Sequence, residues 1–198
     1  MTKQTKCRRC GTCCRQGGPA LHEEDRHLLA GKLKISDLIT IRKDELVYSP
    51  LSGQVEKAEM EFLKIGGQGK SWVCKFFNPA QSSCTIHAWR PLECRELKCW
   101  DTEDIKKIIY KDVINRFDLL EPNEKIIPLL REHEAKCSWH QVNKILRLRQ
   151  TSTNHNKLDE LIRIDLAIRA RAIELFSLTV DQELFYLGRP IFQIVEAM

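Results

Sequence analysis

The sequence predicts an α+β fold, with a small cysteine-rich module followed by a bundle of three to four helices. Three observations support this. Eight of the nine cysteines lie before residue 100, short segments between turn signals fill the first half, and apolar residues after residue 101 recur at helical spacings of three and four. A chain of 198 residues is long enough to bury a core. We therefore expect a cysteine-cluster module over residues 1–101 and a helical region packed against it over residues 102–198.

The first half is expected to contain short strands and helices. Turn signals such as Gly17-Gly18-Pro19 and Asn78-Pro79 separate segments that are too short for long helices. Small strands are predicted over residues 46–48, 62–65 and 72–77. Short helices are predicted over residues 23–29 and from Pro91 onward.

The second half is expected to be helical throughout. The apolar spacing predicts helices over residues 102–120, 128–148, 154–176 and 182–187. Pro122 ends the first helix, and Pro128 is tolerated in the first turn of the second. Thr179 and Gln182 form a capping pair before the last helix, which should end at Gly188.

Composition and the N-terminus indicate a cytoplasmic protein. The chain is 42% hydrophobic and 30% charged, which excludes disordered and low-complexity classes. The first ten residues, MTKQTKCRRC, contain no apolar signal region, and no stretch approaches the ~18 apolar residues of a membrane span. Thiols stay reduced in the cytoplasm, so a dense cysteine cluster there indicates metal binding or redox chemistry before disulfides.

The first cysteine group spells C-x-x-C-x-x-C-C, with Cys7, Cys10, Cys13 and Cys14. A C-x-x-C turn lets two sulfurs converge on one metal at the ~2.3 Å of a zinc–thiolate bond. The longer run also matches the three-ligand part of many iron–sulfur motifs, whose fourth cysteine comes from far along the chain. Neighbouring side chains point apart, so Cys13 and Cys14 are expected to serve different directions. Spacing alone does not choose between zinc and iron.

The second group contains Cys74, Cys84, Cys94 and Cys99, which the fold itself must gather because the first three are ten residues apart. Pro91 can open a helix with Cys94 in its first turn, where the helix dipole and Arg95 should lower the thiol pKa. If that helix continues past Lys98, Cys99 is rotated by ~140° from Cys94, and the two could not share one ion. The expected metal ligands are Cys7, Cys10, Cys13, Cys14, Cys74, Cys84, Cys94 and Cys99.

Basic residues accompany these cysteines. Residues 1–101 carry 17 Lys and Arg against 12 Asp and Glu, whereas residues 102–198 carry 15 of each. A four-thiolate zinc site or [4Fe–4S] cluster has a charge of about −2, which nearby Arg and Lys can offset. Neither a second C-x-x-C nor an H-x(3–5)-H follows, as a zinc ribbon or finger would need. We therefore expect no specific nucleic-acid partner and no membrane contact, and the sequence identifies no protein partner.

Other His, Cys and acidic side chains lie at spacings that a metal site can use. His133, Cys137 and His140 lie at i, i+4 and i+7 of a predicted helix and could complete a metal site. The favoured interpretation is that Cys137 packs in the core while both histidines flank its edge. His22 and His27, among acidic neighbours, are expected on a solvated helix face. The Asp165/Arg169 pair is expected to be an ordinary helix ion pair.

The cysteine segments resemble a known family. The motifs C7-x-x-C10-x-x-C13-C14, C74-K-F-F, C84-T-I-H-A-W-R-P-L-E-C94-R and L-K-C99-W-D-T are similar to those of the YkgJ-type cysteine-cluster family, described as a zinc- or iron-chelating domain. The resemblance covers residues 5–102. It implies that the first seven cysteines are shared, that Cys99 belongs to a subset, and that Arg90-Pro91 is a shared dipeptide. His87 replaces an expected Tyr and is either a spare ligand or a plain substitution.

These observations lead to one function hypothesis and two alternatives. We expect a metal-binding protein with one or two cysteine-thiolate centres, an iron–sulfur cluster of the [4Fe–4S] type being favoured over zinc, in a structural or redox role. One branch of the family resembles flagellin lysine N-methylases, so a cluster-dependent transferase is the first alternative, although no Gly-rich methyl-donor motif is present. A zinc-binding interaction module is the second. Enzymatic activity, substrate, ligand pairing and oligomeric state stay open at this point.

Overall fold

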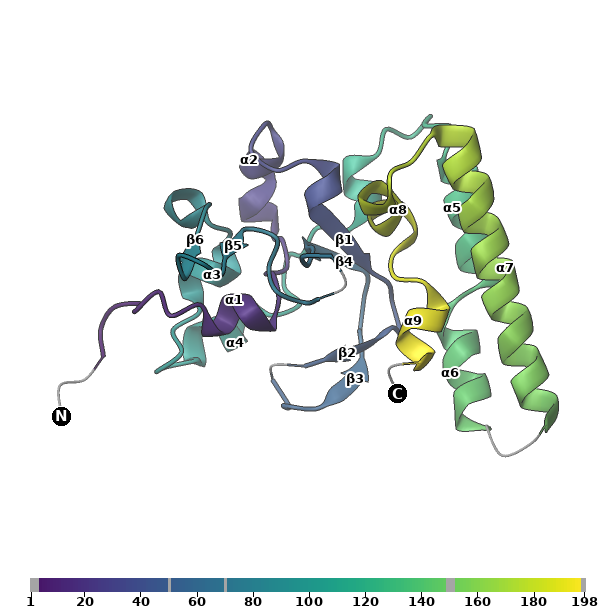
Figure 1. Cartoon of the computed structure of the whole chain (residues 1–198), viewed down its shortest axis with the longest axis horizontal. Coiled ribbons are helices and arrows are strands. Elements are labelled where there is room, and N and C mark those ends of the chain that lie inside the picture. Colours follow the sequence, from purple (N-terminus) through teal and green to yellow (C-terminus); the bar gives the residue numbers. More distant parts are fainter. Residues whose placement is uncertain (1–3, 50, 70, 149–151, 197–198) are drawn as a thin grey trace. The chain divides into compact units, whose positions relative to one another are not determined.

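A computed structural model describes residues 4–49, 51–69, 71–148 and 152–196 (Figure 1). Its contacts divide the chain into two units: unit 1 comprises Met1–Leu38 and Leu63–Ile114, and unit 2 comprises Ile39–Phe62 and Asn115–Met198. This grouping differs from the predicted boundary at residue 101, because residues 39–62 group with the C-terminal helices. The division into a cysteine-cluster module over residues 1–101 and a helical region over residues 102–198 stays a prediction.

The architecture is α+β, as predicted, with helices and small two-stranded sheets. β1 (Leu38–Ile41) pairs with β4 (Phe62–Ile65), β2 (Leu46–Tyr48) with β3 (Val55–Lys57), and β5 (Phe77–Asn78) with β6 (Ser83–Cys84). The last two pairs are antiparallel, with Val47 opposite Glu56 and Phe77 opposite Cys84. The strands predicted at residues 46–48 and 62–65 are confirmed. The one at residues 72–77 is wrong, because only its last residue joins a strand.

Unit 1 is built from short elements around a small core. Its helices and 3-10 turns are α1 (Thr12–Gln16), η1 (Glu23–Asp25), α2 (Arg26–Leu29), η2 (Ile35–Asp37), η3 (His87–Trp89), α3 (Leu92–Glu96) and α4 (Glu103–Ile108). Three fully buried residues, Leu21, Leu63 and Ile114, join distant segments of the chain. Each donates a backbone hydrogen bond to the next: Leu21 to Leu63, Leu63 to Ile114 and Ile114 to Leu21, at 2.8 to 2.9 Å.

This core explains why the helix predicted over residues 102–120 is confirmed only over Glu103–Ile108 and is wrong beyond it. The helix ends at Ile108, and Tyr110 and Asp112 follow with positive φ angles of 62° and 49°. A left-handed residue interrupts a helix. Residues 113 and 114 then pair with the segment around Leu21. The tertiary pairing therefore overrides the helical spacing of Val113 and Phe117.

Unit 2 contains a 3-10 turn and five described helices: η4 (Arg116–Leu119), α5 (Ile127–Lys136), α6 (Trp139–Arg147), α7 (Ser152–Phe176), α8 (Val180–Leu187) and α9 (Ile191–Glu196). The long helix α7 lies along α5 and α6 (Figure 1). The single helix predicted over residues 128–148 is broken, because Ser138 starts a new helix with its side chain accepting a hydrogen bond from the Gln141 N–H. The α8 prediction is confirmed, with Thr179 as its cap and Gly188 at its end.

Two buried arginines hold the interior of unit 2 together. Arg42 and Arg116 are fully buried, and both donate to the Glu134 carboxylate, at 2.7 Å and 2.6 Å. Arg116 also pairs with Glu61 at 3.1 Å. Burial raises the pKa of Glu134, but the two guanidinium charges outweigh it and lower the pKa to about 2. Among the described residues, no helix is long and apolar enough to cross a membrane.

Candidate metal centre

The C-x-x-C-x-x-C-C segment leads into α1 through Gly11. Gly11 has φ 78°, and a Cβ atom there would lie 2.3 Å from the Phe77 ring. Its carbonyl accepts a hydrogen bond from the Arg15 N–H at 2.9 Å, and the Arg15 guanidinium lies 4.8 Å from the centre of the same ring. Only glycine therefore allows the backbone between Cys10 and Cys13 to approach Phe77 this closely.

Replacing Gly11 with alanine is expected to destabilise unit 1 and weaken its metal binding. The left-handed backbone costs a non-glycine residue ~1–2 kcal/mol, and overpacking against Phe77 adds ~1–3 kcal/mol. Gly69→Ala is the matched control, because Gly69 has φ 56° but open space around it. Urea unfolding and metal content measure both variants. Equal losses in the two would show that the contact with Phe77 is unimportant.

Backbone contacts connect Cys14, Cys74 and Cys84. The Cys74 N–H donates to the Cys14 carbonyl at 2.7 Å. The Cys74 carbonyl accepts from the Phe77 N–H at 2.9 Å, and Phe77 is the cross-strand partner of Cys84 in the β5–β6 hairpin. The Gln68 side-chain amide also donates to the carbonyls of Cys74, at 3.0 Å, and of Phe77. These bonds bring together α1, β6 and the loop before β5 that contains Cys74, which we call the Cys74 loop.

Two carboxylates position Cys94 on α3. The buried Asp25 accepts the Leu92 N–H at 2.8 Å, at the first turn of α3, and also the His22 N–H at 3.1 Å. Glu93 accepts the Ala20 N–H at 2.7 Å. The solvated face expected at residues 22–25 is therefore wrong for His22 and Asp25, which are buried against segments up to 89 residues away.

Asp25→Ala is expected to lower the stability of unit 1 by ~2–3 kcal/mol, because it leaves the buried His22 N–H and the partly buried Leu92 N–H without a charged acceptor. Metal affinity should fall by about 10-fold, as for other residues that orient a ligand. Glu24→Ala is the control, since Glu24 is exposed and its ion pair with Arg95 is worth ~0–1 kcal/mol. A metal affinity for Asp25→Ala equal to that of Glu24→Ala would contradict this role.

Five thiols lie within electrostatic reach of one another. We call Cys13, Cys14, Cys74, Cys84 and Cys94 the inner cluster, because their charges shift the pKa values of its members. A hydrogen bond from Cys14 lowers the pKa of Cys13 to about 6. The same bond, with burial and the other thiolates, raises the pKa of Cys14. Several of these sulfurs cannot ionise together in the apoprotein, whereas a bound cation would offset their repulsion.

The pKa lowering expected for Cys94 is wrong. Burial raises its pKa, and the charges of Cys74, Glu93 and Cys84 raise it further. These effects outweigh Arg95 and a helix of only five residues. Because α3 ends at Glu96, Cys99 lies beyond the helix, and the expected rotation of ~140° between Cys94 and Cys99 does not apply.

Three predicted ligands lie outside the inner cluster and are exposed: Cys7, Cys10 and Cys99. Of these three, Cys10 interacts with the inner cluster, because the charge of Cys13 affects its pKa. The Cys10 sulfur also lies 3.3 Å from the Thr12 hydroxyl. The Cys7 sulfur accepts the Arg9 N–H at 3.3 Å, and the Cys99 sulfur lies 3.9 Å from the Gln4 amide. The structure thus brings five of the eight together, places Cys10 within the electrostatic reach of Cys13, and leaves Cys7 and Cys99 apart from them.

His87 lies in η3, upstream of α3. Burial and the charges of Arg90 and Arg9 lower its pKa, so its ring is neutral near pH 7. The Arg90 side chain donates to the His87 carbonyl at 2.8 Å and to the Cys94 carbonyl at 3.3 Å. Arg90 thereby fixes the backbone between His87 and Cys94. A role for the His87 ring as a spare ligand stays a prediction.

A set of thiols gathered from four chain segments, with Cys74 buried and Cys14, Cys84 and Cys94 partly buried, defines a cysteine-rich metal-binding module. A family model for CxxCxxCC, described as "Putative zinc- or iron-chelating domain", matches residues 6–113, which is more than half of the chain. The chain belongs to this cysteine-cluster family, and the resemblance seen in the sequence is confirmed. The match supports metal binding in general. No curated protein and no solved structure matches the chain.

Proposed function

We propose that the chain binds an iron–sulfur cluster of the [4Fe–4S] type through thiolates of the inner cluster, in a structural or redox role in the cytoplasm. The observation that carries this proposal is the convergence of Cys13, Cys14, Cys74, Cys84 and Cys94 from α1, the Cys74 loop, β6 and α3. Five thiols are enough to supply the four cysteine ligands of a [4Fe–4S] cluster.

A [4Fe–4S] cluster and a single zinc ion require different spacings of their thiolate sulfurs. Tetrahedral zinc with ~2.3 Å bonds places its thiolate sulfurs ~3.8 Å apart. In the described part of unit 1, no three cysteines have sulfurs that all lie within 4.8 Å of one another. Four thiolates on a [4Fe–4S] cluster each bind a different iron, so their sulfurs are farther apart than on one ion.

The surroundings suit a negatively charged centre. A four-cysteine [4Fe–4S]2+ cluster has a charge of −2, and Arg9, Arg15, Arg90 and Arg95 all belong to the segments that carry the cysteines. The charge of Lys64 also lowers the pKa of Cys74, although burial raises it by more. We therefore assign the excess of Lys and Arg in the first half to offsetting the charge of the thiolates in the same segments.

The remaining cysteines are assigned to the periphery of the same centre. We propose Cys7, Cys10 and Cys99 as ligands of an accessory metal or as replacements for an inner ligand, so that the chain holds one or two centres. Their exposure makes them accessible to metal delivered from solution. An exposed thiolate can exchange ligands more readily than a buried one, because it needs no opening of the fold.

Anaerobic purification followed by iron, zinc and acid-labile sulfide determination tests the proposal. We expect about four iron and four sulfide per [4Fe–4S] cluster, with a broad visible absorption that bleaches on reduction. Colourless protein that carries zinc and no sulfide in unit 1 would overturn the iron–sulfur assignment. Metal-free protein that keeps the unit 1 fold would overturn metal binding by the inner cluster as well.

A further inference from the structure

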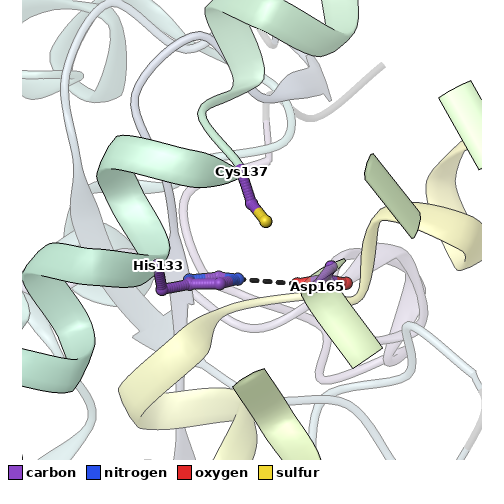
Figure 2. Close-up of side chains that lie close together, drawn as sticks. All are labelled: His133, Cys137 and Asp165. Carbon is purple, nitrogen blue, oxygen red and sulfur yellow. Dashed lines mark hydrogen bonds and ion pairs between the residues drawn. The ribbon is translucent and has the colours of Figure 1, made fainter. Parts of the chain in front are cut away.

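Unit 2 contains a second group of metal-ligating side chains. His133, Cys137 and Asp165 are each fully buried, and one ligand atom from each lies within 4.8 Å of the others. Figure 2 shows the Cys137 sulfur pointing toward the space beside the His133–Asp165 pair. Among the described residues, no other three His, Cys, Asp or Glu side chains converge this closely. The predicted burial of Cys137 is confirmed. The position expected for His133 at the edge of the core is wrong, because His133 is fully buried against α7, whereas His140 is exposed on α6.

The three side chains converge because helices α5 and α7 pack against each other. Cys137 ends α5, and its N–H donates to the His133 carbonyl at 2.8 Å, so the two side chains lie one turn apart on the same side. Asp165 projects from α7, which packs along α5. His133 Nε2 lies 2.6 Å from Asp165 Oδ1. The three ligands are therefore on rigid elements, as a preformed metal site requires.

The carboxylate is held from two other sides. The Ile191 N–H donates to Asp165 Oδ2 at 3.0 Å, and Arg169 Nε donates to Oδ1 at 3.0 Å. Arg169 also pairs with Glu183 at 2.7 Å, and Arg42 with Glu134 at 2.7 Å, so each nearby guanidinium has a carboxylate partner besides Asp165. Such bonds to a ligating carboxylate orient it, as around known metal sites.

The histidine has bonding capacity that the protein does not use. His133 Nδ1 is buried and has no hydrogen-bond partner. A buried polar atom without a partner is costly, and in native proteins it often indicates an ion or water that completes the site. Burial lowers the pKa of His133 to about 4, so the ring is neutral and has one nitrogen with a lone pair. A metal shared with Asp165 binds at Nε2, which faces Oδ1, and the ring proton then lies on Nδ1.

We propose that His133, Cys137 and Asp165 bind a zinc ion in unit 2. One sulfur, one imidazole nitrogen and one carboxylate oxygen form a ligand set typical of zinc, which accepts all three. Tetrahedral zinc separates such ligands by ~3.3–3.8 Å, so the His133–Asp165 contact must open by ~0.7 Å as the metal enters. The thiol proton leaves to solvent when Zn2+ binds, and the local charge changes from −1 to 0.

The same three residue types also occur in cysteine-nucleophile enzymes, but this group does not suit catalysis. The Cys137 side chain is fully buried, so a substrate cannot reach its sulfur. Burial, with the charge of Asp165, raises the pKa of the thiol to about 11. A metal site needs no access for a substrate, because the ion can be incorporated as the unit folds.

Zinc content of the full chain tests this proposal. Cells grown with added zinc should yield native protein with one more zinc per chain than the Cys137→Ala variant. His140→Ala is the control, because His140 is exposed only three residues away, and it should lose none. Iron and sulfide should be unchanged in both variants, so failure here is distinguishable from failure of the unit 1 proposal. Zinc unchanged in Cys137→Ala would overturn the site.

A second measurement on the native chain avoids any variant that does not fold. Cadmium-113 loaded in place of zinc gives resonances whose positions depend on the number of sulfur ligands. We expect one resonance typical of a single thiolate with nitrogen and oxygen ligands, at one cadmium per chain, apart from any multi-thiolate signals of unit 1. A spectrum with multi-thiolate signals alone, or with none, would overturn the proposal.

Discussion

Replacing Cys74 with serine is expected to remove the metal from unit 1 and to unfold it. Cys74 is buried, its N–H donates to Cys14, and its charge acts on Cys14 and Cys94. A structural metal contributes ~10–16 kcal/mol to folding, which is as large as the whole stability of a typical domain, ~5–15 kcal/mol. Iron and sulfide determination, with hydrogen exchange over residues 63–114, measures both effects.

Ser83→Ala is the matched control for this substitution. Ser83 lies beside Cys84 on β6 and is partly buried, but within the described part of the chain its hydroxyl donates only to the Gln81 side chain, at 3.4 Å. It should keep full metal content and native exchange rates. If Cys74→Ser kept its metal and its protection as Ser83→Ala does, the inner cluster would not be the metal site.

Glu134→Gln should have the largest effect in unit 2. It leaves the buried Arg42 and Arg116 guanidinium groups without their shared carboxylate. Breaking a fully buried ion pair costs ~3–5 kcal/mol. The Glu134 side chain is 35% exposed, so solvent screening reduces the expected loss to ~2–3 kcal/mol. Urea unfolding followed by circular dichroism measures the change, because unit 2 contains the long helices.

Glu132→Gln provides the comparison on the same helix. Glu132 pairs with Lys136 and Arg171, both exposed, so solvent screens these pairs and its loss should cost much less than that of Glu134. Equal losses in the two variants would mean that Glu134 stabilises no more than a surface charge. A larger loss for Glu132 would contradict the buried arrangement of Arg42 and Arg116.

Local signals predicted those parts of the fold in which neighbours along the chain decide the structure. The α8 helix follows from Thr179, Gln182 and Gly188, which interact within one helix. The helix over residues 102–120 failed because Ile114 pairs with Leu21 and Leu63, 93 and 51 positions away. Apolar spacing of three and four cannot reveal a competing partner at such a distance.

The candidate site likewise has parts that the sequence predicted and parts that it did not. Residue type and spacing singled out the cysteines, and their number indicated a metal. The sequence did not predict that Asp25 caps α3, because no local signal links Asp25 to Leu92 across 67 positions. Asp165 was misjudged for a related reason. Its i, i+4 partner Arg169 is typical of a surface pair, whereas the packing of α7 on α5 buries both against His133.

Iron K-edge X-ray absorption of the anaerobically purified chain tests the central claim most directly. It reports both the atoms bound to iron and whether a second iron lies next to the first. The account predicts a shell of sulfur ligands with neighbouring iron atoms, and loss of this signal in Cys74→Ser but not in Ser83→Ala. Iron bound by oxygen or nitrogen without an iron neighbour, or no iron at all, would contradict it.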